Sequence, residues 1–82
     1  LENAFLIYPN PVNESLSIDL KSITSEYVEI AIFTESGLLM QTNTYHVGQR
    51  IIEINTSGLT TGIYFLRLKN DKINKSFKLI KQ

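Results

Sequence analysis

The sequence contains no cysteine and no tryptophan, and only two prolines among its 82 residues. Without cysteine, neither a disulfide nor a thiolate metal site can stabilise the fold, so apolar packing has to do so. A chain of this size buries only about 60 % of its unfolded surface on folding, so the core must be efficient. The two absences also exclude an antibody-type domain, which needs a Cys…Trp…Cys pattern.

Long apolar runs and an excess of one charge are also missing. Apolar residues make up 43 % and charged residues 20 % of the chain, as in ordinary globular domains. No apolar run approaches the roughly 20 residues of a membrane span. There is no initiator Met and no signal-peptide pattern. We therefore expect a piece of a longer protein, with residues 1–4 ending a linker and residues 5–82 forming one domain.

The charges are balanced overall but separated along the chain. Residues 1–66 carry seven acids against two bases, a net charge of −5, and residues 67–82 carry six bases against one acid, a net charge of +5. The balance argues against nucleic-acid binding by the whole surface, whereas the basic end can contact an anionic partner. Lysines on an edge strand often only keep the unpaired backbone from recruiting other chains. The residues alone leave that protective role and a recognition role equally supported.

Apolar and polar residues alternate over most of the chain, and this period of two indicates half-buried β-strands. Turn residues such as Glu35-Ser36-Gly37 and Asn70-Asp71-Lys72 separate the strands. We predict an all-β fold, a seven-stranded antiparallel immunoglobulin-like β-sandwich. The expected strands cover residues 5–8, 15–20, 27–34, 38–45, 49–55, 63–69 and 73–81.

The apolar positions of these strands define the predicted core. Truncating a central member such as Ile30 to alanine should cost roughly 2 to 5 kcal/mol. Gly62 should tolerate no substitution if its φ angle is positive, because it turns the chain into the strand that contains Tyr64. The predicted core residues are Leu16, Ile18, Val28, Ile30, Ile32, Ile52, Ile54, Tyr64, Leu66, Leu68, Phe77 and Leu79.

No set of residues suggests catalysis or metal binding. His46 is the only histidine, and a metal site needs several converging ligands. No G-x-S-x-G motif surrounds a serine that could act as a nucleophile. We expect no enzymatic activity, no cofactor and no small-molecule substrate, and we interpret His46 as a polar residue beside a turn.

The segment Tyr8, Pro9, Asn10 and Pro11 precedes the first long alternating strand. Each proline fixes φ and lacks an N–H group, and it biases the residue before it towards an extended conformation. The segment therefore cannot be helix or central strand, and we expect a stiff, extended opening.

Several motifs follow one another in a distinctive order. They are IYPNP at residues 7–11, LSIDL at 16–20, VEIAIF at 28–33, INTSGLTTGIYFLRL at 54–68 and KSFKLIK at 75–81. Together they resemble the type A C-terminal sorting domain of the type IX, or Por, secretion system of Bacteroidetes. The resemblance covers nearly the whole chain.

The resemblance implies a secretion signal fused to the C-terminal side of a cargo protein. Such domains are recognised by the outer-membrane translocon and are typically removed by a sortase, after which the cargo is attached to the cell surface or released. The implied route runs through the periplasm to the surface or the medium. The Tyr8 to Pro11 segment would separate the label from its cargo. The residues implied in translocon recognition are Gly62, Tyr64, Lys75, Phe77, Lys78 and Lys81.

An alternative function is a cell-surface accessory module of fibronectin-like or carbohydrate-binding type. Tyr27, Phe33 and Phe65 lie opposite the predicted core face of their strands, and exposed aromatic rings can stack on sugars. A purely structural spacer is a third alternative. Binding to glycans would support the second, and export that survives deletion of the domain would support the third.

Overall fold

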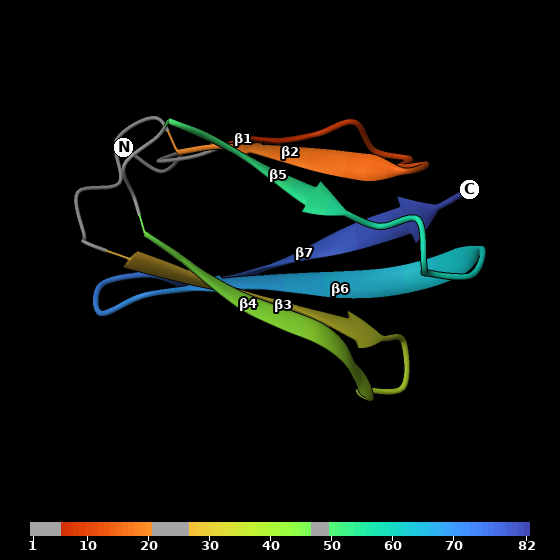
Figure 1. The fold of residues 1–82 in the computed structure, drawn as a ribbon. Coiled ribbons are helices and arrows are strands. Elements are labelled where there is room, and N and C mark those ends of the chain that lie inside the picture. The colour runs from red at the N-terminus through yellow and green to blue at the C-terminus, as the bar shows by residue number, and fades with distance from the viewer. Residues whose placement is uncertain (1–5, 21–26, 47–49) are drawn as a thin grey trace.

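The computed structural model describes residues 6–20, 27–46 and 50–82. This part of the chain forms seven β-strands in two antiparallel sheets that face each other (Figure 1). It contains no helix that is long and apolar enough to cross a membrane. The predicted β-sandwich is confirmed. The strands are β1 (Leu6–Tyr8), β2 (Ser15–Asp19), β3 (Tyr27–Thr34), β4 (Leu39–His46), β5 (Ile51–Asn55), β6 (Gly62–Lys69) and β7 (Asn74–Lys81).

The smaller sheet has the strand order β1-β2-β5, and the larger sheet has the order β4-β3-β6-β7. β2 and β3 follow each other in the chain but belong to different sheets, as do β4 and β5. These crossings between the sheets are typical of immunoglobulin-like sandwiches. They leave β4 and β7, which lie far apart in the sequence, as the two edges of the larger sheet (Figure 1).

The observed strands match the predicted ones closely. β3 has the predicted bounds, and each end of the other strands lies within two residues of its predicted position. The expected linker end at residues 1–4 and the expected strand starts at positions 5 and 49 lie outside the described residues.

The core lies between the two sheets. All predicted core residues are buried except Phe77, which is half-buried and packs against the others from the edge strand β7. Val12 and Leu59 are buried as well, although neither lies in an alternating segment. Thr56 is fully buried and donates its hydroxyl hydrogen to the Asn13 carbonyl oxygen at 3.1 Å. Residues of the connections between strands therefore contribute buried side chains to the core, in addition to those of the strands.

Candidate functional site

The last strand, β7, is held in place along its inner edge by β6. The two strands pair over their full lengths, from Gly62 opposite Lys81 to Lys69 opposite Asn74. The turn between them is organised by Asn70, whose Oδ1 accepts hydrogen bonds from the N–H groups of Lys72 (2.7 Å) and Ile73 (2.8 Å). β7 is therefore a fixed element of the domain.

The side chains of β7 alternate between the core side and the outer face. Leu79, opposite the buried Tyr64, is 1 % exposed and anchors the strand. Lys75 and Lys78 point to opposite sides of the strand and are both exposed. The spacing of three thus distributes the lysines over both faces, as the strand period requires. Lys75 and Lys78 are the accessible cations of β7.

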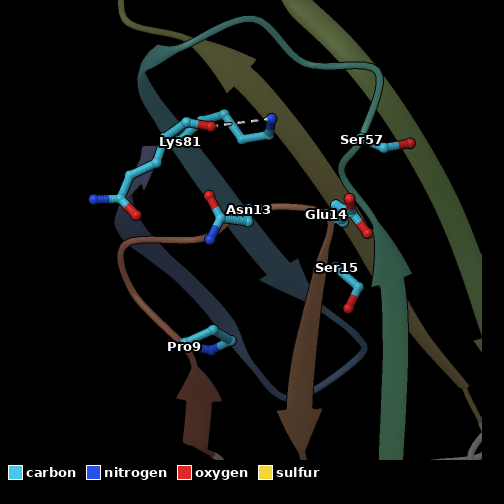
Figure 2. Close-up of a pocket in the computed structure, with 7 residues that line it drawn as sticks. Pro9, Asn13, Glu14, Ser15, Ser57 and Lys81 are labelled. Atoms are coloured by element: carbon cyan, nitrogen blue, oxygen red, sulfur yellow. Dashed lines mark hydrogen bonds between the residues drawn. The ribbon is translucent and has the colours of Figure 1, made fainter.

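Lys81 differs from these two lysines because it is buried, with 8 % of its surface exposed. Its Nζ donates a hydrogen bond to the carbonyl oxygen of Gln82 at 3.4 Å. It lines an open polar pocket of about 740 Å³, shown in Figure 2. The other lining residues are Pro9, Asn13, Glu14, Ser15, Ser57 and Gln82.

The outer edge of β7 is covered over part of its length by the opening segment of the chain. Asn10 Nδ2 donates to the Lys78 carbonyl at 3.0 Å, and the Ile80 N–H donates to Asn10 Oδ1 at 3.0 Å. The Val12 N–H then donates to the Ile80 carbonyl at 2.8 Å, and the Gln82 N–H donates to the Val12 carbonyl at 2.9 Å. We call Asn10 to Val12 the edge cap.

The edge cap changes the interpretation of the YPNP motif. The sequence and its family resemblance predict an extended spacer between label and cargo, whereas the structure places Asn10 on the sandwich itself. Both Tyr8–Pro9 and Asn10–Pro11 are cis peptide bonds. An asparagine carboxamide has a donor and an acceptor side by side, as a peptide group has. Asn10 therefore occupies the position of a peptide group in a neighbouring strand.

Tyr64 and Gly62 serve the fold around β7. Tyr64 is 5 % exposed, and its hydroxyl donates a hydrogen bond to the Thr60 carbonyl at 2.7 Å. A tyrosine near the start of such a strand, bonded to backbone a few residues upstream, is the tyrosine corner of immunoglobulin-like sandwiches. Gly62 has φ +156°, and no atom lies within 4 Å of the position of a Cβ. Its backbone angle, and not a lack of space, therefore restricts substitution.

The three aromatic residues proposed for sugar stacking do not form one platform. Phe33 and Phe65 are neighbours across β3 and β6, but the Arg67 guanidinium lies over the Phe33 ring, 5.2 Å from its centroid. Tyr27 is six residues, or about 20 Å, from Phe33 along β3. Phe65 and Tyr27 are therefore exposed as separate rings and do not form a shared surface for stacking on a sugar.

Arg50 and Asp19 form an ion pair outside β7. Arg50 Nε donates to Asp19 Oδ1 at 2.8 Å, and this hydrogen bond and the carboxylate charge raise the pKa of Arg50. Among the described residues, no three His, Cys, Asp or Glu side chains gather into a group that could hold a metal ion. His46 lies exposed at the end of β4, opposite Tyr27.

Comparison with known proteins identifies one family. A family profile described as a secretion system C-terminal sorting domain matches residues 6–82. No curated protein matches the chain. The matched range includes both the edge cap and β7.

Proposed function

The chain belongs to the family of type IX secretion system C-terminal sorting domains, and we propose that the translocon recognises it through β7 and thereby exports a cargo protein fused before it. The observation that carries this proposal is the position of β7. It is an edge strand, held by β6 and Leu79, that presents Lys75 and Lys78 on its two sides.

The proposed recognition residues divide into two groups by their contacts. Gly62, Tyr64 and Phe77 hold β7 in place, through the backbone turn, the tyrosine corner and packing against the core. Lys75 and Lys78 remain available to a partner, because neither is buried. Lys81 is mostly enclosed and bonded to Gln82, so we assign it to the support of the strand end.

This role is recognition and not catalysis. A sortase would then remove the domain near its N-terminal side, and the cargo would be attached to the cell surface or released into the medium. The proposed partners are accordingly the outer-membrane translocon, the sortase and the fused cargo, without nucleic acid or a small-molecule substrate.

A secretion assay in a Bacteroidetes host tests the proposal. Cargo fused to the domain with Lys75→Gln and Lys78→Gln should accumulate in the periplasm. Its stability should change by only about 0.5 kcal/mol per exposed lysine. The comparison variant is Lys69→Gln with Lys72→Gln, which removes the same charge from positions beside β7 and should reduce export less.

Two outcomes would contradict parts of the proposal. Normal export of the Lys75 and Lys78 variant would show that these charges are not recognised. Normal surface or medium levels of cargo that lacks residues 6–82 would overturn the sorting function itself.

A further inference from the structure

Within the part of the chain that the structure describes, the edge cap binds only the C-terminal half of the outer β7 edge. The N–H and carbonyl groups of Ile80 bond to the edge cap and therefore point away from β6. Because the direction of these groups alternates along a strand, the same holds for every second residue of the strand, which gives Asn74, Ser76, Lys78, Ile80 and Gln82. The cap binds the Lys78 carbonyl, both groups of Ile80 and the Gln82 N–H. The cap therefore ends at Lys78.

Five outward main-chain groups precede the Lys78 carbonyl in β7, namely the N–H and carbonyl groups of Asn74 and Ser76 and the N–H of Lys78. No other residue in the described part of the chain forms a hydrogen bond with them. All three residues are exposed. The open stretch is five residues, or about 16 Å, long. We call this stretch, Asn74 to Lys78, the open slot.

The charges around the open slot are mostly positive. Lys75 and Lys78 lie within it on opposite sides, and Lys72 lies in the turn that leads into it. On the outer face, Lys69 is the cross-strand neighbour of Asn74. An extended segment that paired here would place its side chains next to these cations, so acidic side chains suit it best.

We propose that the open slot binds a short, extended, acidic segment of the translocation machinery as an added β-strand, and that the edge cap sets where this strand ends. The inference rests on the sorting function proposed above. Main-chain hydrogen bonds to an exposed edge give affinity in this binding mode, and side chains give selectivity. The chain itself already uses the same edge in this way, since Val12 forms a parallel bridge with Lys81.

A peptide titration of the 82-residue chain tests the slot directly. The probe is a seven-residue peptide of alternating glutamate and valine, and the control peptide has lysine in place of glutamate. With the acidic peptide, the amide NMR signals of Asn74, Ser76 and Lys78 should shift, and their hydrogen exchange should slow. The amides of Ile80 and Gln82, which are already bonded, should change little. Unchanged slot amides, or equal changes along β4, would overturn the proposal.

One substitution separates strand addition from attraction by charge. Ser76→Pro removes an outward N–H without removing a bond to β6, and proline is tolerated at such edge positions. Ser76→Ala is the matched control, because it keeps the N–H group. The proline variant should bind the acidic peptide about tenfold more weakly, as expected for one lost hydrogen bond, and should be exported poorly. Melting temperatures of both variants show whether the fold is kept, and if the proline variant does not fold, the exchange data on the unchanged chain decide.

The secretion assay distinguishes failure of this inference from failure of the sorting function. If Ser76→Pro folds and is exported normally while cargo without residues 6–82 is retained, the slot is overturned and the sorting signal stands. If that truncated cargo is also exported, the sorting function fails as well.

Discussion

The two edges of the larger sheet differ in how they avoid pairing with other chains. β4 has no buried residue and no lysine, and a register shift between Ile32 and Phe33 disturbs its pairing with β3. Such irregularities twist an edge away from partners. β7 contains Leu79 in the core, lysines on both sides and a cap from its own chain. Of the two edges, β7 is thus the one that packs into the core and is capped by its own chain, and it is also the one that carries the short basic open slot.

The largest expected effect contrasts a residue of β7 with one of β4. Leu79→Ala should lower the free energy of unfolding by about 2 to 5 kcal/mol, because it leaves a cavity in the core. Met40→Ala on β4 removes a side chain that is 44 % exposed and should cost about 0.5 kcal/mol. Urea denaturation of both variants measures the difference. Equal losses would show that β4 contributes to the core as much as β7 does.

The alternation of residue types was sufficient to predict most of the sandwich. It predicted β3 with its observed bounds. It also identified buried residues in β2, β3, β5, β6 and β7. These features depend on neighbours in the sequence and on a period of two, so a single sequence contains them.

The edge cap could not be predicted in the same way. Asn10 and Ile80 are 70 positions apart, and Val12 belongs to no alternating segment, so neither contact has a local pattern. Tyr64 was correctly placed in the core, but its bond to the backbone of Thr60 depends on how the corner folds. The only local hint was an asparagine between two prolines, which indicates a special backbone without naming its partner.

A smaller effect should come from removing the cap, with an asparagine of β4 as the control. Asn10→Ala removes both bonds to β7 and should cost about 1 to 2 kcal/mol, since the two groups that lose their partners lie at the surface and can bind water. Asn43→Ala on β4 removes an exposed side chain and should change stability little. Hydrogen exchange at the Ile80 amide should accelerate in the first variant alone. If it stays slow, Val12 suffices to cover the edge and Asn10 is not the centre of the cap.

The smallest expected effect concerns pH and the inner face of β4. Tyr45 packs partly against the core, and burial raises its pKa above the ordinary value of about 10. As pH rises above 10, the unfolded chain releases the phenol proton before the folded chain does, so this contribution to stability decreases through the folded pKa. Between pH 9 and 11 the free energy of unfolding should therefore decrease more steeply for the natural chain than for Tyr45→Phe, with Tyr27→Phe as the control for loss of an exposed phenol on the neighbouring strand. If the free energy of unfolding depends on pH in the same way for the natural chain and Tyr45→Phe, the Tyr45 phenol is not buried by folding. In that case β4, unlike β7, would bury none of its side chains in the core.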